Sequence, residues 1–124
     1  MIIMVKSSKP RKQRKHRYTA PLHIRKHFMH AHISKDAASK SSVKRKSAQI
    51  SRGDTVKIMS GSRKGKTGKV SKVDTTKGLI FIDGIARKNA KGRELQIPIR
   101  PSAVYITELN MTDKRRAAKL TAGR

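Results

Sequence analysis

The stretch that decides the fold is G-D-T-V-K-I-M-S-G-S-R-K-G-K-T-G-K-V-S-K-V-D, which runs from Gly53 to Asp74. Val56 and Ile58 stand two positions apart in its first part, and two more valines return after the glycines. A period of two puts one set of side chains on a buried face and the other set in solvent. The pattern therefore predicts a strand, a tight glycine loop and a second strand.

The loop within this stretch combines backbone freedom with positive charge. Glycine adopts positive φ angles or leaves room for another backbone, including that of a polyanion. The structural glycines of the stretch are Gly53, Gly61, Gly65 and Gly68. Cations stand between and just after the last three of these glycines. The turn therefore presents a cationic ridge, which is made of Arg63, Lys64, Lys66 and Lys69.

Part of this loop, from Gly61 to Thr67, resembles a phosphate-binding P-loop but fails the tests for one. Three residues separate Gly61 from Gly65, where the P-loop motif needs four. The residues after Thr67 have a strand pattern, whereas a P-loop must open a helix whose N-terminus faces the phosphate. The sequence therefore disfavours a nucleotide hydrolase.

The composition points to a polyanionic partner. The 124 residues include 32 Lys and Arg against 7 Asp and Glu, which gives a formal net charge of +25. Ordinary soluble domains have surfaces of mixed sign, and so much positive charge repels itself in isolation. The charge is spread as +13 in residues 1–50, +9 in residues 51–107 and +3 thereafter. This spread favours a structural RNA-binding protein that covers phosphates along a long path over a reader of one short base sequence.

Other kinds of partner find little support. Cysteine is absent, so there is no disulfide frame and no thiolate metal site. His23 and His27 stand at helical i, i+4 spacing, which suits a metal clamp, but they lack further ligands, so we expect no metal and no cofactor. The apolar opening Met1–Val5 is far too short to span a bilayer or to act as a signal peptide, so we expect no membrane partner. Met4 is an alternative to Met1 as the first residue of the natural chain.

The acidic residues offer no catalytic arrangement. A hydrolase needs a nucleophile or an acid–base pair with tuned pKa values. Asp54, Asp74 and Asp83 precede strands or lie in turns, where carboxylates commonly accept hydrogen bonds from the local backbone. No two carboxylates stand at a catalytic spacing. We therefore expect no enzymatic activity and no small-molecule substrate.

The N-terminal portion divides into a basic tail and a region of short helices. Residues 1–18 form the tail, and because its basic part carries no acid and no aliphatic side chain, we expect disorder in the free chain and ordering on RNA. A merely solvated tail and a nuclear-targeting tail are the alternatives. Residues 19–48 are expected to hold one helix over residues 21–30, a second from the N-cap Ser34 toward Lys40, and a basic linker.

Residues 49–107 carry the main fold. After the opening hairpin, the apolar run Leu79–Ile82 predicts a central strand, and Asp83–Gly84 marks either a bulge or the next turn. A basic loop is expected over residues 86–93. Glu94–Arg100 then alternates as a strand.

Proline confines that strand to the edge of a sheet, because Pro98 has no N–H to donate to a neighbour. A last strand is expected over residues 101–106. Five short strands with turns at this spacing predict a mainly β chain, built on a small five-stranded antiparallel barrel of the SH3-like kind. Residues 108–124 are expected to form a basic C-terminal tail with one or two helical turns, capped by Thr112.

Aliphatic residues that face inward from these strands form the expected core: Val56, Ile58, Val70, Val73, Ile80, Ile82, Leu95, Ile97, Val104 and Ile106. At about 1.5–3 kcal/mol for each full burial, they offset the ordering of the backbone only marginally. We therefore expect the barrel to gain much of its working stability from its partner.

Four runs of residues carry a family resemblance. The pattern of Gly53–Asp74 resembles a KOW motif, which transcription elongation factors also contain. The tail Lys9–Lys15, the run Ala20–His23 and the run Ile97–Ser102 narrow the resemblance to KOW-type large-subunit ribosomal proteins in their archaeal and eukaryotic form, which are homologues of bacterial large-subunit protein twenty-four. The resemblance covers roughly residues 5–112, and the Ser-rich and Lys-rich segment Ser34–Ser47 departs from it, which counts against the second short helix.

The resemblance implies a structural role in the large ribosomal subunit of the cytoplasmic ribosome. It implies binding near the 5′ part of large-subunit rRNA, early in assembly and near the polypeptide exit tunnel, beside neighbouring large-subunit ribosomal proteins. A transcription elongation module and a DNA-compacting protein are the alternatives. An elongation module usually includes a larger domain that grips polymerase, for which this chain has no room.

RNA recognition should rest on phosphates and on folded RNA shape. Few aromatic side chains are available for base stacking, and Phe81 is expected in the core, which leaves Tyr18, Phe28 and Tyr105. Besides the four cations of the ridge, the expected RNA-binding residues are Lys9, Arg11, Lys12, Arg14, Lys15, Arg17, His23, Arg25, Lys26, Arg52, Arg87, Lys88, Lys91, Arg93 and Arg100.

Overall fold

The structure, a computed structural model, describes residues 5–122, so the two candidate start methionines lie outside the described part of the chain. The helices are α1 (Pro10–Thr19), α2 (Leu22–Arg25), the 3₁₀ helix η1 (Lys26–Phe28), α3 (Lys35–Lys40), the 3₁₀ helix η2 (Pro101–Ala103) and α4 (Lys114–Thr121). The strands are β1 (His30–Ile33), β2 (Ser47–Gln49), β3 (Thr55–Ile58), β4 (Thr67–Asp74), β5 (Leu79–Lys88), β6 (Glu94–Ile99) and β7 (Val104–Glu108).

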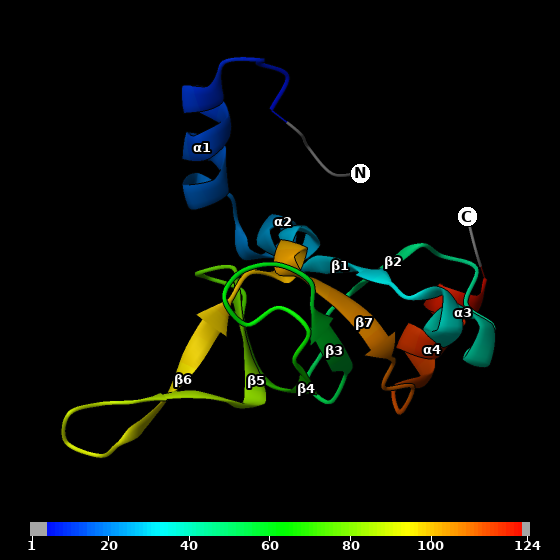
Figure 1. The fold of residues 1–124 in the computed structure, drawn as a ribbon. Coiled ribbons are helices and arrows are strands. Elements are labelled where there is room, and N and C mark those ends of the chain that lie inside the picture. Colours follow the sequence, from blue (N-terminus) through cyan, green and yellow to red (C-terminus); the bar gives the residue numbers. More distant parts are fainter. Residues whose placement is uncertain (1–4, 123–124) are drawn as a thin grey trace.

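The described strands form one mixed sheet in the order β2-β1-β7-β3-β4-β5-β6 (Figure 1). β1 and β7 pair in parallel, and the other neighbours are antiparallel. This confirms that the chain is mainly β, and the five predicted strands are the consecutive neighbours β7-β3-β4-β5-β6. The pairing is an open series that ends at β6, so Pro98 does lie in an edge strand. Closure into an SH3-like barrel stays a prediction.

β5 is longer than the sequence pattern indicates. The basic loop predicted over residues 86–93 is wrong in its first part, because the strand continues to Lys88 and pairs there with β6. The register of this pairing shifts between Phe81 and Ala86. Asp83–Gly84 lies within that interval, which favours a bulge over a turn at this point.

The helix predicted over residues 21–30 is wrong at its C-terminal end. α2 and η1 stop at Phe28, and His30 already begins β1. Met29 is fully buried between them, and its carbonyl accepts a hydrogen bond from the N–H of Ile50 at 2.9 Å. Pairing of β1 with both β2 and β7 outweighs the weak helical stripe that the sequence shows.

The second short helix begins where the sequence predicts it. α3 follows Ser34, whose hydroxyl oxygen accepts a hydrogen bond from the N–H of Ala37 at 3.2 Å. Asp36 lies in its first turn, where a carboxylate stabilises the positive end of the helix dipole. The second short helix therefore forms, with Ser34 as its cap, within the Ser-rich and Lys-rich segment.

The hydrophobic core is larger than the sequence predicts. Leu95 is wrong as a core residue, since it is 51% exposed on the projecting β5–β6 hairpin, and Val73 and Ile97 are only partly buried. Phe81 lies outside the core cluster, half-buried, with the ammonium of Lys72 6.0 Å from its ring centroid. The other seven predicted residues are buried. They are joined by residues from both flanking regions, from the segment just before β3 and from β5: Met29, Ala31, Ile33, Ala37, Val43, Ala48, Ile50, Ile85 and Leu120.

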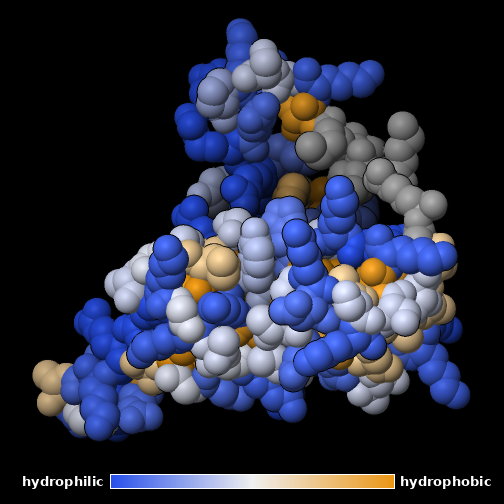
Figure 2. Space-filling view, turned by 45° about the vertical axis from the view of Figure 1, so that its right-hand side comes forward, coloured by the Kyte–Doolittle hydropathy of each residue, from blue (hydrophilic) through white to orange (hydrophobic). Residues whose placement is uncertain are grey.

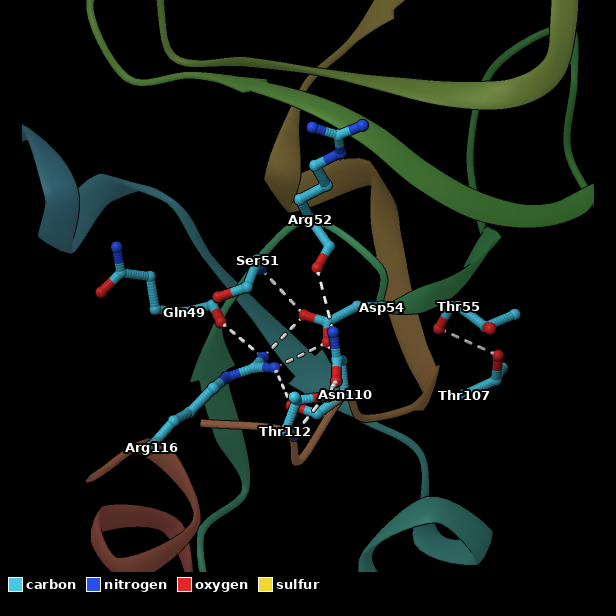
Figure 3. Close-up of polar contacts among 9 residues, drawn as sticks. All are labelled: Gln49, Ser51, Arg52, Asp54, Thr55, Thr107, Asn110, Thr112 and Arg116. Atoms are coloured by element: carbon cyan, nitrogen blue, oxygen red, sulfur yellow. Dashed lines mark hydrogen bonds and ion pairs between the residues drawn. The ribbon is translucent and has the colours of Figure 1, made fainter. Parts of the chain in front are cut away.

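A buried ion pair joins the start of the central hairpin to the C-terminal helix (Figure 3). Asp54 is completely buried, and its two carboxylate oxygens accept hydrogen bonds from the guanidinium of Arg116 at 2.7 and 2.6 Å. The N–H groups of Ser51 and Asn110 donate to the same carboxylate at 2.8 Å each. Arg116 also donates to the carbonyls of Asn110 and Gln49 at 2.6 and 3.0 Å. We call this arrangement the Asp54–Arg116 latch.

The C-terminal tail packs on the core through α4. The predicted cap Thr112 is wrong, because Asp113 precedes the helix and its carboxylate accepts a hydrogen bond from the N–H of Arg115 at 2.9 Å. Thr112 instead donates its backbone N–H to the side-chain oxygen of Asn110. Leu120, in the last turn, is buried in the core cluster.

The central hairpin requires glycine at position 68 for lack of space. A Cβ there would lie 2.5 Å from Cγ2 of Ile82 and 2.7 Å from the backbone oxygen of Asp83. We expect Gly68→Ala to lower the free energy of unfolding by about 1–3 kcal/mol through this overpacking, as measured by urea denaturation. Gly65 is the matched control, because its φ is +89° but nothing lies within 4 Å of a Cβ there.

Gly65→Ala should lower the free energy of unfolding only by the cost of the left-handed backbone conformation, about 1–2 kcal/mol. Gly65→Asn should be more stable than Gly65→Ala, because asparagine tolerates positive φ. At position 68 we expect no such gain in stability from asparagine over alanine. An equal gain at positions 65 and 68 would contradict the packing argument.

Candidate nucleic-acid interface

Three cations of the ridge, Arg63, Lys64 and Lys66, lie on the loop between β3 and β4, and Lys69 lies near the start of β4. The N–H of Gly65 donates to the carbonyl of Ile58 at 2.8 Å, and the N–H of Ile58 donates to the carbonyl of Lys66 at 2.9 Å. These bonds close the loop and fix its backbone. Lys64, Lys66 and Lys69 are exposed, whereas Arg63 is half-buried. The ridge therefore presents ammonium groups to solvent from a backbone that is already in place.

The basic tail forms α1, a helix that carries no buried side chain. Figure 1 shows α1 projecting away from the sheet. All six of its predicted RNA-binding residues are exposed, counting Lys9 at the N-cap. His16 meets the ring of Phe28 edge-on at 6.3 Å, and the guanidinium of Arg17 lies 5.7 Å from the same ring centroid. Disorder of this segment in the free protein stays a prediction.

Arg25 ties α1 to the rest of the molecule. Its guanidinium donates to the carbonyl of Ala20 at 2.8 Å, to that of Tyr18, and to that of Thr76 at 3.1 Å. These contacts satisfy carbonyls at and just beyond the C-terminal end of α1 and reach the turn between β4 and β5. In this structure Arg25 therefore has a positioning role, and its predicted contact with RNA stays a prediction.

The β5–β6 hairpin carries a third group of cations. Arg87, Lys88, Lys91 and Arg93 are all exposed near its tip, where the N–H of Asn89 donates to the carbonyl of Arg93 at 2.9 Å. The hairpin extends beyond the core (Figure 1), and hydrophilic side chains dominate the face of the molecule seen in Figure 2. The remaining predicted residues, His23, Lys26, Arg52 and Arg100, are also exposed but lie on other segments. The predicted residues thus occupy several elements and do not form one cluster.

A basic cavity was not predicted from the sequence. It measures about 360 Å³, and it is lined by the cations Arg45, Arg115, Arg116 and Lys119, by the imidazoles of His27 and His30, and by one acidic residue, Asp113. The rings of His27 and His30 stack at 6.3 Å. Partial burial lowers the pKa of His30 below its ordinary value, and repulsion from His27 and Arg45 lowers it further. The cavity is therefore electropositive and suits an anionic group such as a phosphate.

The sequence holds only a faint signal for this cavity. Its basic residues come from segments on both sides of the central hairpin, and the hydrogen bond from Arg116 to the carbonyl of Gln49 holds α4 beside β2. Within residues 5–122, no group of three His, Cys, Asp or Glu residues is placed to hold a metal ion. No helix in the same range has the length and apolar character needed to cross a membrane.

Known proteins similar to this chain match it along almost its whole length. A family model that describes the eukaryotic ribosomal proteins L26 and their archaeal L24 counterparts matches residues 7–122. A large ribosomal subunit protein uL24 from Methanospirillum hungatei is 46% identical over 97% of this chain and 98% of its own length. Proteins of the same name from Methanosarcina barkeri and Pyrobaculum islandicum are 48% and 47% identical, over 92% and 89% of this chain and 97% and 88% of their own lengths. The resemblance that the sequence motifs carry is thereby confirmed, and the chain belongs to the family of eukaryotic L26 and archaeal L24 ribosomal proteins.

Proposed function

We propose that this chain binds and stabilises folded large-subunit rRNA near its 5′ region, as an early assembly protein close to the polypeptide exit tunnel. Its family consists of ribosomal proteins, so the chain has a structural role in the cytoplasmic ribosome and is not an enzyme. Neighbouring large-subunit proteins are its further partners. We also infer that strands β7-β3-β4-β5-β6 work as a KOW unit of the SH3-like kind.

The observation that carries the proposal is α1. A helix of 10 residues with no buried side chain gains little from packing, since its ring contacts within residues 5–122 are limited to those of His16 and Arg17 with Phe28. Isolated helices shorter than about 12–15 residues are marginal in water. Its Lys and Arg side chains also repel one another. A polyanion laid against α1 removes that repulsion and releases its own counterions. The ridge and the β5–β6 hairpin extend the same surface chemistry to two further elements.

The experiment is a competition at matched salt between a folded 5′ fragment of large-subunit rRNA and duplex DNA of equal charge. We expect the full chain to prefer the rRNA fragment by at least about tenfold, because folded RNA offers a shape as well as phosphates. A folded fragment from another part of the subunit is the control for the 5′ location. Equal affinity for rRNA and DNA would overturn the proposal in favour of a general polyanion binder.

A further inference from the structure

The outer face of the sheet carries an aromatic pair, Tyr105 and His32, that lies outside the predicted phosphate-binding residues. Tyr105 and His32 stand directly opposite each other in the parallel pairing of β7 and β1. Their chain neighbours on both strands, such as Ile33 and Ile106, are buried in the core. Alternation along a strand therefore turns both rings outward. Tyr105 is 39% exposed, so part of its ring is open to solvent.

The two rings form a corner on this face. Their centroids are 5.7 Å apart, and their planes are inclined at 61°. A flat group laid on one ring therefore meets the edge of the other. Such edge and face contacts are favourable between π systems. The corner suits a planar aromatic ligand better than an aliphatic one.

The strands beside the corner supply positive and hydrogen-bonding groups. Lys57 of β3 is in register with Tyr105 on its other side, and Thr67 of β4 is in register with Lys57. Ser47 of β2 is in register with His32. This cross-strand row runs over five neighbouring strands and contains no acidic residue. A ligand with a flat ring and an attached negative charge therefore matches it.

We propose that Tyr105 and His32 hold one unpaired base of the bound RNA, with Lys57 on the adjoining phosphate. The inference deepens the proposed function and rests on it. Bases inside a double helix are stacked on their neighbours, so the ligand of this site is a nucleotide of a loop, bulge or single strand. The corner holds a single base, so phosphate contacts still dominate the affinity, in line with the small number of aromatic residues.

The chain allows a direct optical test, because it contains two tyrosines and no tryptophan. In a Tyr18→Phe background, Tyr105 is the only strong fluorophore, and a base stacked on its ring quenches it. The full chain is titrated with single-stranded oligoadenylate of about ten nucleotides and with a paired RNA duplex of equal charge. Tyr18 is 80% exposed on α1, so its replacement leaves the sheet unchanged.

We expect oligoadenylate to quench Tyr105 and the duplex to bind without quenching it. Tyr105→Leu should weaken oligoadenylate binding about 5- to 100-fold, leave duplex binding unchanged, and keep the salt dependence because no charge is removed. Tyr105→Phe in the otherwise natural chain should bind as tightly as the natural chain. Binding of both RNAs without quenching, or equal effects of Tyr105→Leu and Tyr105→Phe, would overturn this inference alone. Failure to bind either RNA would overturn the proposed function as well.

Discussion

Replacing Arg116 with methionine should lower the free energy of unfolding by about 3–5 kcal/mol, the largest effect that we expect from any single substitution in this chain. The substitution removes the guanidinium from a carboxylate that is completely buried, and Asp54 then keeps only the two backbone N–H groups of Ser51 and Asn110. Methionine retains much of the arginine stem, so the loss reports the charge and its hydrogen bonds. Urea denaturation at neutral pH measures it.

The neighbouring Arg115 is the matched control. It is exposed on the same helix, and Arg115→Met should change the free energy of unfolding by less than about 0.5 kcal/mol. The double variant Asp54→Asn/Arg116→Met should be more stable than the sum of the two single changes predicts, because neither charge is then left unpaired. Additive effects would show that the latch is not an interacting pair.

Replacing Arg63, Lys64 and Lys66 together with glutamine should weaken rRNA binding and make the slope of log K against log salt shallower by about 2–3. Each cation that neutralises a phosphate releases counterions, so the change in slope reports how many phosphates these three side chains neutralise. The measurement is a set of binding isotherms between about 50 and 200 mM salt. An unchanged slope would mean that the ridge does not touch phosphate.

An equal loss of charge elsewhere separates local contact from general attraction. Lys35, Lys40 and Lys44 lie in or after α3, are exposed, and belong to no predicted contact. Their replacement by glutamine lowers the net charge by the same amount, and we expect a smaller change in slope. Equal changes for the two triple variants would indicate long-range attraction with no preferred surface.

The sequence predicts those parts of the fold in which neighbouring residues carry the signal. Alternation of Val56 and Ile58, and the apolar run Leu79–Ile82, were sufficient to identify the central strands. β1 and β2 were missed because each is short, and because β1 also pairs with β7, which is distant in the chain. The latch was missed for the same reason, since Asp54 and Arg116 are 62 residues apart.

The residues of the candidate interface also fall into those that adjacent sequence reveals and those that only the fold brings together. The ridge and the tail are runs of adjacent cations, so composition locates them. The basic cavity and the Tyr105–His32 corner are made of residues that only the register of the sheet and the docking of α4 bring together. Arg25 shows the opposite case, because a basic residue in a basic run is held by three backbone carbonyls.

The parallel pairing of β1 with β7 also sets an order of events during synthesis. A growing chain can form the β3–β4 hairpin and add β5 and β6 as each emerges, since these partners are neighbours in the chain. The β1–β2 hairpin is made first, but it docks on the sheet only after β7 has been translated. Contacts between distant parts of a chain form slowly. The first strands to leave the ribosome are therefore the last strands to join the sheet. Until they do, the basic tail and α1 before them are free to contact RNA.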